Sequence, residues 1–128
     1  MWLGLRIFLN KPFQRFVRKE GITYDAICEA IKRADRGLID ADLGGGVIKQ
    51  RIPRPNEGRS GGYRWIVIYR VGEVALFIHG FAKNEKDNIT DLELSTFREL
   101  AKAIFEINPD KLDRKLEERN WTKVNYDE

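Results

Sequence analysis

Residues 44–88 read GGGVIKQRIPRPNEGRSGGYRWIVIYRVGEVALFIHGFAKNEKDN, and this stretch decides the expected fold. It holds three strand-like runs, at 47–52, 63–71 and 74–82. A Pro/Gly/Arg-rich loop separates the first two runs, and a tight turn at Gly72 separates the last two. Neighbouring apolar runs with short connections favour an antiparallel meander. The sequence therefore predicts a small twisted sheet at the centre of the molecule.

Basic residues gather in the same stretch. A period of two places Lys49 and Arg51 on one face of their strand, and Arg64 and Arg70 on one face of the next. The loop between these strands adds Arg54 and Arg59, and across the two strands and this loop only Glu57 carries the opposite charge. We therefore expect one apolar face and one basic, tyrosine-bearing face, which suits a polyanion such as nucleic acid.

The flanking segments complete an α+β fold. A first strand is expected within 2–9, and helices are expected at 11–20 and 22–37, the second capped by Thr23. Residues 38–43 favour a short extended piece. A capping box at Thr90–Glu93 opens a helix to about residue 107, and a charged helix follows at 110–119. The residues expected to be buried on the longer helix are Leu94, Phe97, Leu100, Ala101 and Ile104.

The predicted architecture is a twisted antiparallel sheet of about four strands, with an N-terminal helical pair packed on it and C-terminal helices. A length of 128 residues suits one domain, divided as 1–108 with 109–128 as a helical extension of the same domain. Residues 1–70 carry 14 Lys/Arg against 7 Asp/Glu, whereas residues 71–128 carry 9 against 13. This uneven balance, within a net charge of +3, favours a domain that meets an anion on one side.

Several classes of protein are disfavoured. The single cysteine, Cys28, allows no internal disulfide, and the sequence shows no metal-ligand cluster. Gly44–Gly46 is not followed by a Lys-Ser/Thr pair or a helix, so it is not a phosphate loop. We expect no cofactor and no metal. No signal peptide or run of about 20 apolar residues is evident, so a cytoplasmic location without membrane contact is expected.

The segments GRSGGYR (58–64) and FAKNEKDNI (81–89) resemble the RelE/HigB group of type II toxin–antitoxin toxins, with a HigB-like branch most similar. The resemblance covers roughly residues 6–105. It implies a ribosome-dependent mRNA endonuclease that needs no metal and inhibits translation. In this family the 2′-hydroxyl beside the scissile phosphate is the nucleophile, and Lys and Arg side chains stabilise the charge. It also implies a cognate antitoxin, usually with a DNA-binding part such as a helix-turn-helix.

Carried over by position, the resemblance assigns catalytic roles to Lys49, Arg51, Arg64 and Lys83. The chain departs from RelE at Asn84, where RelE has an arginine, and at Thr90, where RelE has a catalytic tyrosine. Either other groups substitute, with His79, Tyr63 and Arg59 as candidates, or cleavage is weak or absent. We include His79 among the catalytic candidates. The candidates for RNA contact are Arg54, Arg59, Tyr63 and Arg70.

Most of these residues also have a purely structural interpretation. Lys49 and Arg51 suit a solvated sheet face, and Lys83 suits an ordinary polar turn. A lone histidine in an apolar strand, such as His79, is commonly a core residue, and Tyr63 suits strand packing. Two other functions remain open: a ParE-like toxin that acts on DNA gyrase, and an RNA-binding module without catalysis.

Overall fold

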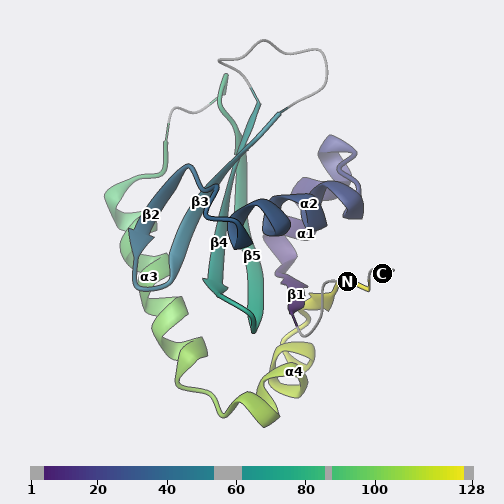
Figure 1. Cartoon of the computed structure of the whole chain (residues 1–128), viewed down its shortest axis with the longest axis vertical. Coiled ribbons are helices and arrows are strands. Elements are labelled where there is room, and N and C mark those ends of the chain that lie inside the picture. Colours follow the sequence, from purple (N-terminus) through teal and green to yellow (C-terminus); the bar gives the residue numbers. More distant parts are fainter. Residues whose placement is uncertain (1–4, 54–61, 86–87, 126–128) are drawn as a thin grey trace.

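The computed structural model describes residues 5–53, 62–85 and 88–125, and within them the chain forms one sheet with helices around it (Figure 1). In chain order the described elements are β1 (Arg6–Leu9), α1 (Lys11–Glu20), α2 (Tyr24–Asp35), β2 (Ala41–Gly44), β3 (Val47–Ile52), β4 (Tyr63–Arg70), β5 (Val74–Ala82), α3 (Asp91–Phe105), α4 (Pro109–Glu118) and β6 (Thr122–Lys123).

The described strands lie in the order β2-β3-β4-β5-β1-β6. Strands β3, β4 and β5 form the predicted antiparallel meander. β1 lies parallel to β5, and β6 pairs antiparallel with β1. The α+β fold class is confirmed, but within the described residues the sheet is mixed and has six strands rather than about four antiparallel ones. A two-residue strand such as β6 is too short to show a period, and sequence alternation does not reveal the direction of pairing.

Helices α1 and α2 cover one face of the sheet, so the predicted N-terminal helical pair is confirmed. Phe13 of α1 and Ile31 of α2 are fully buried in a core that includes Trp65 and Phe77 of the central strands. Phe13 packs edge-on against Trp65, with ring centroids 5.5 Å apart. Aromatic pairs of this geometry contribute beyond the area that they bury.

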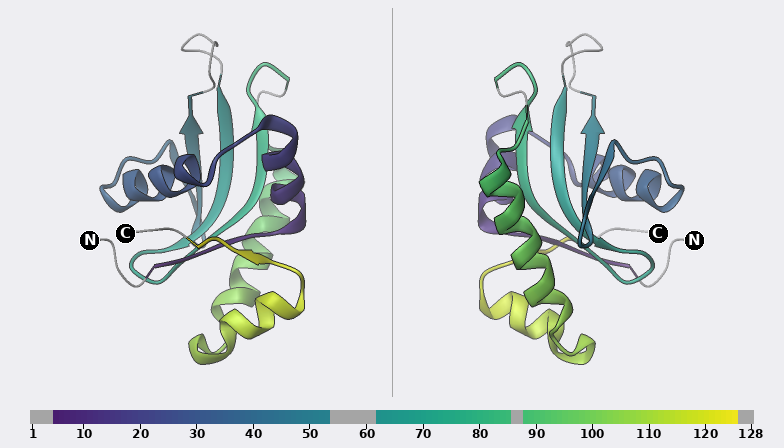
Figure 2. Two further views of the ribbon diagram at one scale, coloured as in Figure 1. Left: turned by 90° about the vertical axis from the view of Figure 1, so that its right-hand side faces the viewer. Right: turned by 90° about the vertical axis from the view of Figure 1, so that its left-hand side faces the viewer.

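The opposite face is covered as well, which corrects the expectation of a single apolar face. Ile66, Ile68 and Leu76 are fully buried there, packed with Ile104 of α3 and Leu112 of α4. After α3, helix α4 turns below the sheet and the chain returns to β1 (Figure 2). Central strands that are apolar on both sides need cover on both sides, and α3 and α4 provide the second layer.

The helix starts agree with the sequence. Asn10 caps α1, Thr23 caps α2 and Asn108 caps α4, while Thr90 and Glu93 form the predicted capping box of α3. The burial expected along α3 is only partly right, because Ala101 and Ile104 are buried whereas Leu94, Phe97 and Leu100 are only partly so. No helix within the described ranges combines the length and apolarity that a membrane crossing needs.

Candidate active site

The register of the meander brings most of the candidate catalytic residues to one end of one sheet face. Arg51 of β3 lies directly opposite Arg64 of β4, and Lys49 lies opposite Ile66, which itself pairs with His79 of β5. Lys83 follows β5 directly, and its N–H donates to the carbonyl of Gly62 at 2.9 Å. We call Lys49, Arg51, Arg64, His79 and Lys83 the basic cluster.

Asp40, just before β2, holds two members of this cluster in place. One of its carboxylate oxygens, Oδ2, lies 3.6 Å from Lys49 Nζ and 3.8 Å from Arg64 Nε. The side chains of Lys49 and Arg64 are only 16% and 10% exposed, and two arginines opposite each other on neighbouring strands repel. Asp40 offsets this repulsion. The sequence did not single it out, because nothing local shows that it folds back onto the sheet.

A β-bulge in β5 decides where His79 points. Ile66 pairs with His79 but Val67 pairs with Phe77, so Ile78 is an extra residue on β5. Without it, alternation from Val74 would turn His79 toward α1 and α2. With it, His79 shares the α3 side of the sheet with Arg64. Bulges often re-aim a side chain in this way beside active sites. Asn10 supports the bulge by donating from Nδ2 to the Ile78 carbonyl at 3.0 Å.

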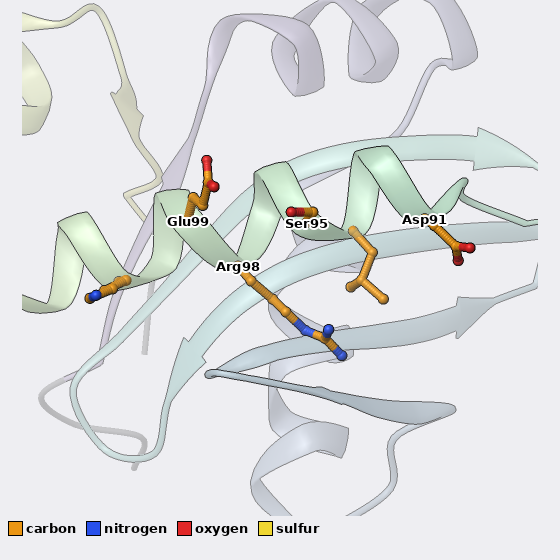
Figure 3. Close-up of a pocket in the computed structure, with 6 residues that line it drawn as sticks. Asp91, Ser95, Arg98 and Glu99 are labelled. Carbon is orange, nitrogen blue, oxygen red and sulfur yellow. The ribbon is translucent and has the colours of Figure 1, made fainter.

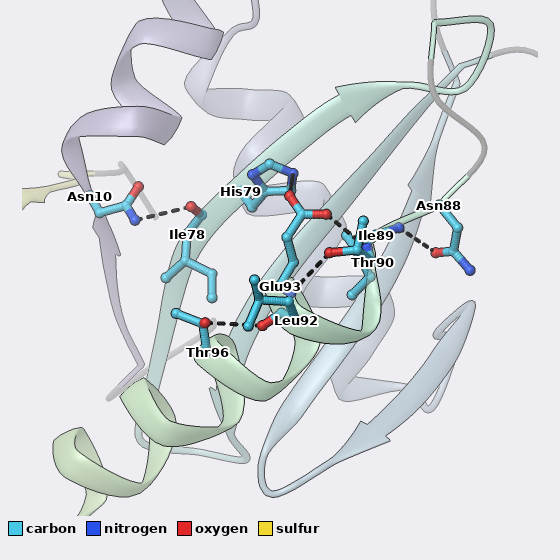
Figure 4. Close-up of polar contacts among 9 residues, drawn as sticks. All are labelled: Asn10, Ile78, His79, Asn88, Ile89, Thr90, Leu92, Glu93 and Thr96. Carbon is cyan, nitrogen blue, oxygen red and sulfur yellow. Dashed lines mark hydrogen bonds and ion pairs between the residues drawn. The ribbon is translucent and has the colours of Figure 1, made fainter.

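Helix α3 places a carboxylate beside this histidine. His79 Nε2 lies 3.7 Å from Glu93 Oε2, while Glu93 Oε1 accepts from the Thr90 N–H at 2.8 Å (Figure 4). The imidazole also packs against Phe97, with ring centroids 5.4 Å apart, and against Phe81 at 5.9 Å. The sequence identified Glu93 only as a capping residue. Its second role depends on the bulge, which the sequence did not reveal.

A comparison against protein families identifies the family to which this chain belongs. The model of the RelE toxin of the RelE/RelB toxin–antitoxin system matches residues 5–124. The chain belongs to the RelE family. Membership makes it a toxin of a toxin–antitoxin system, with a cognate antitoxin as its partner. No curated protein matches it significantly.

Two of the candidates for RNA contact lie away from the basic cluster of this RelE-family chain. Tyr63 is on the α1 side of the sheet, 4% exposed, and its hydroxyl donates to Glu20 Oε1 at 2.9 Å. Its buried ring is not available to stack on a base. Arg70 pairs with Glu73 and lies over the Phe105 ring at 4.1 Å. It stands about 20 Å along β4 from Arg64, given the usual rise of a strand.

Four further positions singled out from the sequence are not members of the basic cluster. Arg54 and Arg59 lie outside the described residues. Asn84 is exposed in the turn after β5. The Thr90 hydroxyl accepts from the Glu93 N–H at 3.0 Å, so it serves as a helix cap at the position to which the resemblance assigns the tyrosine of RelE.

A shallow pocket of about 400 Å³ lies along α3 (Figure 3). It is lined by Asp91, Leu94, Ser95, Arg98, Glu99 and Lys102, none of which belongs to the basic cluster. Arg98 donates from Nε to the Leu43 carbonyl at 2.8 Å and so joins α3 to β2. The lining carries two acidic and two basic side chains, so it favours neither an anionic nor a cationic ligand. This pocket is therefore separate from the candidate active site of the RelE-family toxin.

Proposed function

We propose that this RelE-family toxin is a ribosome-dependent mRNA endonuclease that inhibits translation. The observation that carries the proposal is the register of the meander, which gathers Lys49, Arg51, Arg64 and Lys83 at one end of the sheet. Such a set of cations suits the phosphodiester backbone of RNA. We further propose that the toxin acts in the cytoplasm, and that its antitoxin carries a helix-turn-helix.

The proposed reaction is attack of an RNA 2′-oxygen on the neighbouring phosphorus. The O2′–P bond forms and the P–O5′ bond breaks, which leaves a 2′,3′-cyclic phosphate and a 5′-hydroxyl end. Charge builds on the phosphoryl oxygens in the transition state, and fixed cations stabilise that charge strongly where water is excluded. Lys49 and Arg64 are largely buried and held by Asp40, so they are fixed cations shielded from water. Arg51 is exposed, so an RNA strand can contact it directly.

A second candidate is a ParE-like action on DNA gyrase without nuclease chemistry. It is favoured by one observation: Asn84 and Thr90 replace the arginine and tyrosine of RelE, and the Thr90 hydroxyl is engaged in a helix cap. The third candidate, RNA binding without catalysis, would use the same basic cluster. The nuclease proposal therefore needs a proton-transfer group other than those two residues.

The deciding experiment maps the 5′ ends of cellular RNA shortly after the toxin is induced. It compares wild type with the Lys49→Ala/Arg51→Ala double variant. We expect new ends at fixed codon positions inside translated frames, reduced about 10²-fold or more in the double variant, by analogy with the loss of one oxyanion donor.

The matched control is Lys111→Ala/Arg114→Ala, which removes the same charge from two exposed positions on α4. This control should cleave as wild type does. Growth arrest without new RNA ends would overturn the nuclease proposal and favour gyrase as the target. RNA binding with neither cleavage nor growth arrest would favour the non-catalytic module.

A further inference from the structure

We propose that Glu93 is a positioning residue that holds His79 as the proton donor to the 5′-oxygen leaving group. The inference rests on the proposed nuclease function and deepens it, because it supplies the proton-transfer group that Asn84 and Thr90 do not. It uses a residue from α3 that neither the basic cluster nor the family resemblance includes. The geometry of the His79–Glu93 pair carries it.

The bulge in β5 places His79 on the same face of the sheet as Arg64. The bulge at Ile78 turns the imidazole toward α3, and the Asn10 amide bonds the bulge carbonyl at 3.0 Å. Phe81 and Phe97 then pack against the ring. The side chain remains 27% exposed although Nε2 itself is buried, so its exposure lies on other ring atoms. The imidazole is thus fixed in orientation and still accessible.

The capping box of α3 holds the side chain of Glu93 in place. In the capping box its backbone N–H donates to the Thr90 hydroxyl, and its Oε1 accepts from the Thr90 N–H. This arrangement leaves Oε2 directed at His79 Nε2, at 3.7 Å. A carboxylate beside an imidazole sets the orientation of the ring and stabilises its protonated form, as in hydrolase triads. Distances of this size in unliganded enzymes commonly shorten when substrate binds.

The charges around His79 favour a role as an acid toward a phosphodiester. Glu93 faces the imidazole from α3, and Arg64 lies diagonally across from it on β4. Lys49 lies on β3 in the same cross-strand row, and Lys83 follows His79 along the chain, just after β5. The cations attract the phosphate, and Glu93 opposes their effect on the imidazolium. A diagonal neighbour on an adjacent strand is about 7–8 Å away, which one phosphodiester group can bridge.

The step balances without a metal or cofactor. The 2′-oxygen bonds to phosphorus, its proton passes to solvent water, and the P–O5′ bond breaks. The proton on His79 moves to O5′, which leaves as a hydroxyl, and the neutral imidazole is then reprotonated from solvent. General acid catalysis by a positioned histidine contributes about 10²–10⁴ in rate. We expect His79→Gln to lose cleavage by this factor.

One test follows the titration of His79 by proton NMR in untagged protein. His79 is the only histidine in the chain, so its imidazole C–H signal needs no further assignment. Glu93→Gln removes the charge but keeps a residue that suits a capping box. We expect it to lower the titration midpoint by roughly half to one pH unit, after allowing for solvent screening. Glu99→Gln, the same change at an exposed position of α3, should leave the midpoint where it is. An unchanged midpoint in Glu93→Gln would overturn the inference.

The second test measures single-turnover RNA cleavage against pH on programmed ribosomes. A general acid must be protonated, so activity falls as pH rises through its titration. We expect Glu93→Gln to cleave about tenfold more slowly, given that acid catalysis as a whole is worth about 10²–10⁴. Its alkaline limb should move to lower pH, while Glu99→Gln follows wild type. If wild type cleaves and the Glu93→Gln profile matches it, only this inference fails. If wild type does not cleave, the proposed function itself fails.

Discussion

Gly46, in the turn between β2 and β3, lies under the ring of Phe105 with a φ of 86°. A Cβ at this position would come within 2.4 Å of Phe105 Cε2. Gly72 has a similar φ of 74°, but a Cβ there would meet nothing within 4 Å. The two glycines therefore share a backbone requirement and differ in packing, which makes them a matched pair.

We expect Gly72→Ala to lower the free energy of unfolding by about 1–2 kcal/mol, the cost of the left-handed conformation. Gly46→Ala should cost about 1–3 kcal/mol more, because it also overpacks the core beneath α3. Urea denaturation of both variants measures the difference. Equal losses would show that the Phe105 ring moves aside at no cost.

Cys28 gives a prediction about pH at the same scale. Burial raises the pKa of the Cys28 thiol above its ordinary 9.0; Lys32 lowers it and Asp25 raises it, each by less. Since the folded state keeps the proton longer than the unfolded state, this contribution to stability is complete below pH 9.0. It is lost as pH rises from there through the raised pKa.

Thermal melts between neutral and strongly alkaline pH, compared with Cys28→Ala, measure the effect. The wild-type melting temperature should fall more steeply above pH 9.0 than that of the variant. Parallel curves would contradict the prediction. Other groups titrate in the same range, and the variant serves to subtract them.

Among the elements, the junction of β1, α1 and β5 depends on Asn10. Its Oδ1 accepts from the Phe13 N–H at 2.9 Å to cap α1, and its Nδ2 donates to the carbonyl of Ile78 in the bulge. Asn10→Asp keeps the cap but places a carboxylate oxygen against that carbonyl. We expect a loss of about 1–3 kcal/mol in the free energy of unfolding, as for an unsatisfied buried acceptor.

The matched control for this junction is Asn108→Asp at the start of α4. There the side-chain oxygen accepts from the Asp110 N–H and acts as a cap. Asp and Asn are about equally good caps, so the control should be nearly neutral. Equal effects of the two substitutions, compared by urea denaturation, would contradict a special role for the bulge contact.

Sequence alternation predicted part of the candidate site and missed the rest for a definite reason. It grouped Lys49 and Arg51 on one face of β3, and it assigned Arg64 to one face of β4. Because β3 and β4 pair without interruption, these two faces lie on the same side of the sheet. It could not place His79, since one extra residue in β5 reverses every side chain beyond it. Asp40 and Glu93 reach the site through contacts between distant elements, which no local pattern encodes.

For the whole molecule, the uneven charge predicts how RNA binding depends on salt. Each phosphate contact with single-stranded RNA contributes a slope of about −0.7 to the plot of log affinity against log salt concentration. Removing two contacts with Lys49→Ala/Arg51→Ala should therefore reduce the steepness by about 1.4. Fluorescence anisotropy with a 2′-O-methyl oligonucleotide, which cannot be cleaved, measures both slopes. A reduction of the same size in Lys111→Ala/Arg114→Ala would show that binding follows net charge rather than the basic cluster.

The position of β1 has a consequence for how the chain folds as it is synthesised. Among the described strands β1 is synthesised before the others, and it pairs with β5 through Arg6 and Val74 and with β6 through Phe8 and Lys123. The β3-β4-β5 meander needs only contacts between neighbours in sequence, which form faster than distant ones. We therefore expect the sheet to assemble out of the order of synthesis, with the meander first and the edge between β1 and β6 last. The complete sheet of the toxin can exist only after Lys123 has left the ribosome.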